Sequence, residues 1–223
     1  MTLPILFFAA GLGTRMKPLT DDRPKPLIKV GGKPLLDHAR DVANAVGATP
    51  QVVNLHYKGQ MIRDHLADQD VFFSDETDLL RDTGGGLRHA LPLLGEGPVI
   101  TMNTDAVWSG PNPIGLLLAH WQPHMEALLL VVPKRQVFGH KGKGDFAIDS
   151  AGHLHRGRDC IYSGVQIIRP DILSETDEEV FSLNPVWDRI GNEGGLYGVH
   201  YGGYWCDVGQ PESIPMAEAL CRV

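Results

Sequence analysis

A short apolar run near the start of the chain is followed at once by glycines and cations. Residues 3–8 have the length of a strand and carry no charge, and Gly11, Gly13 and Arg15 come directly afterwards. Glycines let a backbone approach a ligand closely, so that consecutive N–H groups of such a loop can face one anion. Arginine adds a planar pair of donors that matches phosphate oxygens. This stretch therefore predicts a phosphate-binding loop, with a plain tight turn as the alternative.

Two familiar glycine-rich motifs do not fit this loop. A dinucleotide fingerprint needs a third glycine where the chain has Met16, and Pro18 follows too soon for a helix to begin. A P-loop needs serine or threonine after Gly-Lys, but Lys33 is followed by Pro34. The phosphate site must therefore be of another kind.

A single lysine is held between two prolines a few residues later. Pro24 and Pro26 flank Lys25, and each proline restricts both its own backbone and that of the residue before it. A lysine on such a backbone loses little further entropy when it binds a ligand. Lys25 is therefore a candidate phosphate ligand, although the same pattern alone would also suit a surface loop.

Two aspartates come at or near the ends of predicted strands. Asp105 follows the apolar segment 98–103, and Asp207 lies in the late sequence Tyr-Trp-Cys-Asp-Val-Gly. Two carboxylates that converge from separate strands can hold one Mg²⁺ and leave its other positions to phosphate oxygens and water. Each aspartate alone would more often be a solvated turn residue or a cap.

A third glycine-rich stretch, Asp82-Thr83-Gly84-Gly85-Gly86, precedes a helical pattern. Exposed amides at such a helix start can meet a nucleotide without obstruction from side chains. The alternative is that Asp82 or Thr83 caps the helix.

Together, AAGLGTRMKPLT and the following RPKPL resemble the signature of the sugar-phosphate nucleotidyltransferases. Members of this family join a nucleoside triphosphate to a sugar 1-phosphate and release pyrophosphate. The resemblance extends over the whole chain and implies a single nucleotidyltransferase domain over residues 1–223, with a three-layer α/β/α Rossmann-like fold around a mixed, mainly parallel sheet.

The resemblance also implies roles for individual residues. Catalysis would fall on Arg15 and Lys25, and Mg²⁺ on Asp105 and Asp207. The nucleotide would be bound by Ala10, Gly11, Gly13, Thr14, Arg15, Thr83, Gly84 and Asp105. The sugar would lie in the second half, against Asp145, Ser163 and Gly164. One departure is Thr104, where the family commonly has glycine.

The short chain and its motifs resemble most closely the branch of the family that uses UTP and N-acetylmuramate 1-phosphate in cell-wall recycling. The branch that uses GTP and mannose 1-phosphate is the alternative, and a non-catalytic nucleotide-binding regulator on the same fold is a second. The reaction implied is an in-line attack of a sugar-phosphate oxygen on the α-phosphorus, without a covalent intermediate.

Strands and helices alternate along the first half of the chain, as they do in parallel sheets with crossover helices. Strands are predicted at residues 3–8, 51–54, 71–74, 98–103 and 127–132, and helices at 34–46, 59–67 and 85–94. The second half predicts strands at 146–148, 161–168 and 197–201 and a helix near 180–190. Ligands of such sheets bind beyond the carboxyl ends of the strands, where the motifs lie.

The composition excludes several classes of protein. A net charge of −7 and a pI near 5.8 argue against nucleic-acid or anionic-membrane partners. Three cysteines without a CxxC pair favour a reducing compartment. No apolar run approaches the roughly 20 residues of a membrane span. We expect a cytoplasmic enzyme of small-molecule substrates, and the sequence leaves its oligomeric state open.

Overall fold

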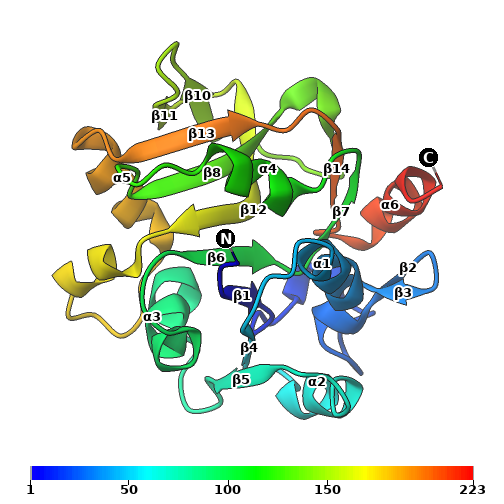
Figure 1. Ribbon diagram of the computed structural model, residues 1–223. Coiled ribbons are helices and arrows are strands. Elements are labelled where there is room, and N and C mark those ends of the chain that lie inside the picture. Colours follow the sequence, from blue (N-terminus) through cyan, green and yellow to red (C-terminus); the bar gives the residue numbers. More distant parts are fainter. Residues whose placement is uncertain (1, 223) are drawn as a thin grey trace.

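The computed structural model describes residues 2–222, in which nine strands form a central sheet with helices against both faces (Figure 1). The strands of this sheet are β1 (Ile5–Phe8), β4 (Gln51–Leu55), β5 (Phe72–Asp75), β6 (Val99–Asn103), β8 (Ala127–Pro133), β10 (Phe146–Ile148), β11 (Leu154–Arg156), β12 (Cys160–Ile168) and β13 (Leu196–His200). The α-helices are α1 (Leu35–Asn44), α2 (Gly59–His65), α3 (Asp82–Leu94), α4 (Pro113–His120), α5 (Leu183–Asn192) and α6 (Ile214–Leu220).

Side chains of β1 alternate between two apolar cores. Ile5 and Phe7 belong to the core formed with α1, α2 and α4, whereas Leu6 belongs to the core formed with α3 and α5. Successive residues of a strand point to opposite faces of the sheet, so a fully apolar strand has both faces covered. All three side chains are completely buried, which stabilises the fold by about 1.5–3 kcal/mol each. The three-layer α/β/α prediction is confirmed.

The sheet reverses its winding direction at β1. β1 lies between β4 and β6 and runs parallel to both, and β4 runs parallel to β5 at the sheet edge. Such a reversal opens a crevice at the carboxyl ends of the strands. The glycine loop after β1 therefore starts where ligands of this sheet class bind.

The second half of the chain makes the sheet mixed. β12 pairs antiparallel with both β6 and β8, and its register shifts between Tyr162 and Gln166. Gly164 lies inside this bulge with φ of +82°, and a Cβ there would stand 2.8 Å from the Asn103 side chain. Glycine at this position lets β12 pass close to the end of β6.

Two small sheets complete the structure. β7 (Ala106–Ser109), β14 (Tyr204–Asp207) and β9 (Val137–Phe138) form one, and β2 (Lys29–Val30) with β3 (Lys33–Pro34) forms the other. Both contribute to a third core that packs under α6. Within residues 2–222, no helix has the length and apolar character that crossing a bilayer would require.

The strands and helices predicted from the sequence are all present, with shifted ends. α3 begins at Asp82 rather than at residue 85, and α5 begins at Leu183 rather than near residue 180. β7 and α4 were not predicted. Five short 3₁₀ helices, η1 (Thr14–Met16), η2 (Lys25–Leu27), η3 (Lys134–Gln136), η4 (Pro170–Glu175) and η5 (Pro211–Ser213), connect the described elements.

Candidate active site

A cavity of about 630 Å³ opens beyond the carboxyl end of β1. This volume falls within the usual range for sites that bind small molecules and cofactors. The predicted residues that line it are Ala10, Gly11, Gly13, Thr14, Arg15, Lys25, Thr83 and Asp105. The cavity thus brings together predicted residues from the glycine loop after β1 and from segments further along the chain, at Thr83 and Asp105.

The glycine loop presents a run of free backbone donors. Within the described chain, the backbone N–H groups of residues 11–15 have no hydrogen-bond acceptor. Gly13 adopts φ of +63°, and the Thr20 hydroxyl donates to its carbonyl at 2.9 Å. Consecutive unpaired amides in a turn form a concave anion site. This geometry is what a phosphate-binding loop requires.

The entry to the loop is fixed by a buried amide that the sequence did not reveal. Oδ1 of Asn54 accepts the N–H groups of Ala9 at 2.6 Å and Ala10 at 3.1 Å. Nδ2 of Asn54 donates to Oε1 of the fully buried Glu76 at 2.8 Å. The amide of Ala10 is therefore already paired, and the free donors begin at Gly11.

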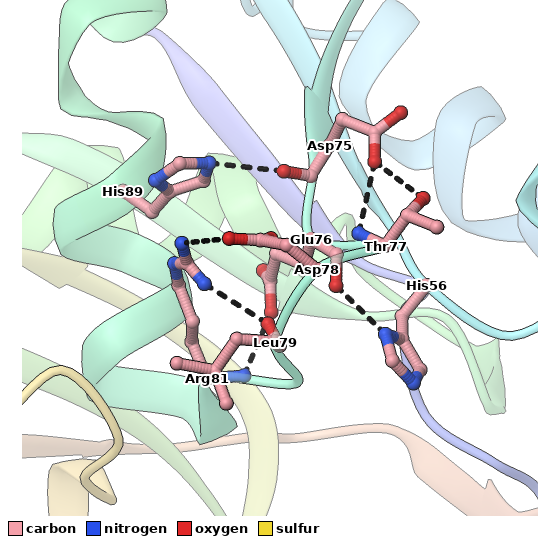
Figure 2. Close-up of polar contacts among 8 residues, drawn as sticks. All are labelled: His56, Asp75, Glu76, Thr77, Asp78, Leu79, Arg81 and His89. Carbon is pink, nitrogen blue, oxygen red and sulfur yellow. Dashed lines mark hydrogen bonds and ion pairs between the residues drawn. The ribbon is translucent and has the colours of Figure 1, made fainter.

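Glu76 belongs to the loop between β5 and α3, which is anchored from both sides (Figure 2). Nδ1 of His56 lies 2.7 Å from the Glu76 carbonyl oxygen, and Nε2 of His89 lies 3.0 Å from that of Asp75. The second carboxylate oxygen of Glu76 accepts the backbone N–H of Arg81 at 3.0 Å. These hydrogen bonds fix the position of the loop, which contributes Glu76 to the cavity wall.

Lys25 and Asp105 meet across the cavity. Nζ of Lys25 lies 2.8 Å from Oδ2 of Asp105, and only 12% of the lysine side chain is exposed. Arg15 is exposed and lines the same cavity. Two cationic residues therefore line the same cavity as the free amides of the glycine loop.

Asp207 is brought to Asp105 by the small sheet. β14 pairs with β7 so that Asp207 stands opposite Ala106, and Val208 N–H donates to the Asp105 carbonyl at 2.8 Å. Asp207 does not itself line the cavity, but Gly209 does, and a Cβ on Gly209 would lie 3.0 Å from Oδ1 of Asp207. The two aspartates are neighbours at one rim.

His140 is a further residue at this rim that the sequence analysis missed. Its Nδ1 lies 3.1 Å from Oδ2 of Asp207, and this hydrogen bond raises the pKa of His140. Its Nε2 is buried without a partner among the described residues, beneath Gly142. The isolated histidine carried no motif, because its partner is 67 residues away.

Thr104, the departure from the family pattern, has a structural role. Its hydroxyl donates to the carbonyl of Phe8 at 2.7 Å and so joins the ends of β6 and β1. The threonine is buried and leaves Asp105 free to face the cavity.

The glycines after Asp82 pack against protein. The N–H groups of Gly84 and Gly85 both donate to the Phe181 carbonyl, at 2.9 and 3.1 Å. A Cβ on Gly84 would lie 2.4 Å from the Phe181 ring. Gly84 does not line the cavity, so its predicted contact with a nucleotide stays a prediction. For its N–H to bind a nucleotide, the hydrogen bond from Gly84 to the Phe181 carbonyl would have to break.

Neither cap that the sequence suggested for α3 forms. Oδ1 of Asp82 accepts the adjacent Thr83 N–H at 2.6 Å, whereas the Thr83 hydroxyl accepts the N–H of Leu183 at 3.0 Å. Thr83 thereby ties the start of α3 to the start of α5.

A smaller cavity of about 290 Å³ adjoins the first and shares Phe8, Asp82, Thr83 and Asn103 with it. Asp145 lines it, and its Oδ2 accepts the Tyr162 N–H at 2.8 Å. Ser163 is buried and, like Gly164, is not among the lining residues. The contacts predicted between a sugar and these three residues stay predictions, and Asp145 is the one placed to make them directly.

Within residues 2–222, no three His, Cys, Asp or Glu side chains are arranged to hold a metal ion by themselves. A cation at this site would therefore rest on Asp105 and Asp207 together with ligands from a substrate.

A glycine loop with free amides lies at the switch point of a three-layer sheet, and Arg15, Lys25 and Asp105 line the same cavity. This is the arrangement expected of an enzyme of nucleotidyl transfer. The chain belongs to the family of the MobA-like NTP transferase domain, whose model matches residues 5–202. Together with the curated relatives described next, this match confirms the resemblance to sugar-1-phosphate nucleotidyltransferases.

Two curated relatives show how far this similarity extends. The chain is 37% identical to N-acetylmuramate alpha-1-phosphate uridylyltransferase of Caulobacter vibrioides, over 96% of this chain and 95% of that protein. It is 27% identical to a probable mannose-1-phosphate guanylyltransferase of Oryza sativa, over 92% of this chain but 61% of that protein.

The fold is shared with solved nucleotidyltransferase structures. A putative glucose-1-phosphate thymidylyltransferase from Bacillus anthracis superposes with a TM-score of 0.81, covering 98% of this chain and 95% of that one. Only 16% of residues are identical, so this likeness concerns the fold alone.

Proposed function

We propose that this enzyme transfers the uridylyl group of UTP to N-acetylmuramate 1-phosphate and releases pyrophosphate. The observation that carries the proposal is the run of unpaired amides at residues 11–15, in the same cavity as the Lys25–Asp105 pair. The choice of substrates is supported by the similarity over almost the full length to the Caulobacter vibrioides enzyme.

The chain's own residues supply binding, orientation and charge. The amides of the glycine loop hold the triphosphate, with Arg15 and Lys25 opposite its oxygens. An ionised oxygen of the sugar phosphate attacks the α-phosphorus in line, the bond to the β-phosphate oxygen breaks, and pyrophosphate leaves with that electron pair. The nucleophile is already deprotonated near neutral pH, so positioning and charge stabilisation provide the catalysis.

The two aspartates fit a magnesium ion as partial ligands. Each carboxylate has one oxygen engaged, Asp105 by Lys25 and Asp207 by His140. The remaining oxygens are hard ligands of the kind that Mg²⁺ prefers, and this ion usually takes few protein ligands beside water and phosphate. When bound, Mg²⁺ would neutralise charge on the phosphate oxygens.

The proposed product also suggests where the enzyme works. N-acetylmuramate is a cell-wall sugar, so its activation by UTP points to recycling of peptidoglycan. Nucleoside triphosphates are cytoplasmic, and we propose that the reaction takes place there.

A second candidate keeps the chemistry and changes the substrates to GTP and mannose 1-phosphate, as favoured by the similarity to the Oryza sativa protein.

Pyrophosphate release should be measured for UTP and GTP, each with N-acetylmuramate 1-phosphate and with mannose 1-phosphate, with and without Mg²⁺. The proposal predicts the highest kcat/KM for UTP with the muramate ester. Preference for the mannose pair would establish the second candidate, and no turnover with any pair would reject both.

A further inference from the structure

The smaller cavity contains one cation among its described lining residues, and it is held in place. Arg156 donates from Nε to Oδ1 of Asp188 at 2.6 Å, and from Nη2 to the backbone and side-chain oxygens of Asn184 at 3.1 and 3.0 Å. Its guanidinium also stacks on the Phe146 ring, 4.8 Å from the ring centroid. The side chain therefore has little rotational freedom left to lose when it binds a ligand.

One end of this guanidinium remains available. Within residues 2–222, Nη1 of Arg156 has no acceptor, whereas Nε and Nη2 are both engaged. The other charged lining residues, Asp82 and Asp145, are acidic, and one oxygen of each already accepts a backbone N–H. The cavity thus offers acceptors for hydroxyl or amide groups on one side and a cationic donor on another.

Part of the remaining wall is aromatic and includes Phe146, Tyr162 and Trp187. The Tyr162 and Trp187 rings meet edge to face at 4.8 Å, and Phe146 stands 6.1 Å from Trp187. A buried aromatic surface suits the apolar face and small alkyl groups of a sugar derivative. A fixed guanidinium can donate to a hydroxyl of a neutral hexose, but its charge-assisted hydrogen bond to a sugar carboxylate would be stronger.

We infer that Arg156 selects a sugar 1-phosphate bearing a carboxylate substituent, by donating to that carboxylate from Nη1. The inference rests on the proposed function, because the cavity adjoins the proposed nucleotide site and shares four lining residues with it. N-acetylmuramate carries such a group on its lactyl ether, whereas N-acetylglucosamine is the same sugar without it. Arg156 is therefore a residue of substrate specificity, separate from the groups around the phosphates.

The test compares Arg156→Gln with the wild-type enzyme on these two sugar 1-phosphates, with UTP. Loss of a hydrogen bond between charged groups should lower kcat/KM for the muramate ester by about ten- to a hundredfold, mainly through KM. The N-acetylglucosamine ester, measured as a substrate or as a competitive inhibitor, should be bound equally well by both proteins. For Arg156→Lys, kcat/KM with the muramate ester should lie between the values of the wild type and Arg156→Gln, because lysine keeps the charge and loses the planar geometry.

Arg158→Gln provides a matched control. Arg158 is exposed, lies two residues further along the chain and lines neither cavity. The Arg158→Gln enzyme should bind both esters as the wild type does.

The outcomes separate this inference from the proposed function. An equal loss on both sugars in Arg156→Gln would show that the arginine only supports the cavity wall, and no loss on the muramate ester would show that it does not contact the substrate. Either result overturns the inference while the wild-type activity stands. A wild-type enzyme that prefers the neutral ester, or uses neither, would overturn the inference and the proposed function together.

Discussion

Asn54 and Glu76 form a buried hydrogen bond of 2.8 Å that joins the end of β4 to the loop before α3. Asn54 uses its carbonyl oxygen for the amides of Ala9 and Ala10, so its orientation is fixed by the carboxylate behind it. The position at which the glycine loop leaves β1 therefore depends on Glu76, which is fully buried and more than 60 positions away.

Glu76→Gln should destabilise the protein and weaken nucleotide binding. The amide replaces one acceptor by a donor, so either Nδ2 of Asn54 or the N–H of Arg81 loses its partner. An unsatisfied buried donor costs about 1–3 kcal/mol. Thermal or urea unfolding should show this loss, and KM for the nucleotide should rise because the loop entry is less well fixed.

Asp78→Asn is the matched control for this variant. Asp78 lies in the same loop, but its side chain is 68% exposed, and among residues 2–222 it pairs only with the Arg81 guanidinium. Its effect should stay within about 0.5 kcal/mol. Equal stability of the two variants would contradict a supporting role for Glu76.

Much of this architecture could be predicted from the sequence because the signals are local. β1 and β8 are uninterrupted apolar runs, and β4 and β6 are buried strands in which apolar residues predominate. The glycine loop and the proline-flanked Lys25 are read from adjacent residues. The pairing of Asp105 with Asp207 followed only from resemblance. The structure provides its cause in the antiparallel pairing of β7 with β14.

The parts that could not be predicted depend on contacts between distant segments. Asn54 and His140 are single polar residues without a motif, and each acquires its role from a partner on another element. The three glycines after Thr83 have the composition of a ligand loop, yet the amides of Gly84 and Gly85 donate to the Phe181 carbonyl. Glycine lets another group approach the backbone closely, but the sequence does not say whether that group belongs to a ligand or to the protein itself. The structure is needed to tell the two apart.

Gly13→Ala should disrupt the phosphate loop more than an equivalent change elsewhere. Its φ of +63° costs an L-residue about 1–2 kcal/mol. A Cβ would also lie 2.9 Å from Cγ2 of Thr20 and 3.1 Å from Cβ of Lys25, which adds about 1–3 kcal/mol of overpacking. Displacement of Lys25 should lower kcat/KM as well.

Gly31→Ala measures the cost of placing an L-residue at positive φ without a steric clash. Gly31 has a similar φ of +59° in the turn between β2 and β3, and no atom lies within 4 Å of a Cβ placed there. The free energy of unfolding should fall by only the about 1–2 kcal/mol expected for the positive φ, and kcat/KM should be unchanged. Identical losses in the two alanine variants would rule out a steric role for Thr20 and Lys25.

Asp75 should make a pH-dependent contribution to stability. Hydrogen bonds from the Thr77 hydroxyl and N–H (Figure 2), followed by one from Arg63, lower the pKa of Asp75 from 3.8 to about 2. A lowered pKa means that the stabilisation is complete above about pH 4 and is lost as the pH falls through about 2. Half of the side chain is exposed, so screening limits the effect to less than about 1 kcal/mol.

The melting temperatures of wild type and Asp75→Asn, measured from pH 6 to pH 2, should reveal this contribution. The variant should melt lower near pH 6, and the difference should shrink towards pH 2 as the wild-type carboxylate becomes protonated. A difference that stays constant over this range would show that the charge of Asp75 has no part in it.

Asp105→Asn and Asp207→Asn should abolish most turnover while preserving the fold. Each change removes one negative charge at nearly constant shape, and the amide oxygen can still accept from Lys25 or His140. If the two carboxylates hold Mg²⁺ beside the phosphates, kcat should fall by roughly 100-fold or more, as for loss of other groups that stabilise charge in a transition state. Pyrophosphate release at saturating substrate would measure this.

The dependence on Mg²⁺ concentration separates loss of an ion from loss of a hydrogen bond. In both variants the Mg²⁺ concentration for half-maximal activity should rise, because each has lost one of the two ionised ligands. Asp41→Asn, on the exposed side of α1 and paired with Lys33, should behave as the wild type. If either active-site variant kept full activity at the same Mg²⁺ concentration, that aspartate would not be a ligand. If both variants did so, the positive charge that phosphoryl chemistry requires would have to come from Arg15 and Lys25.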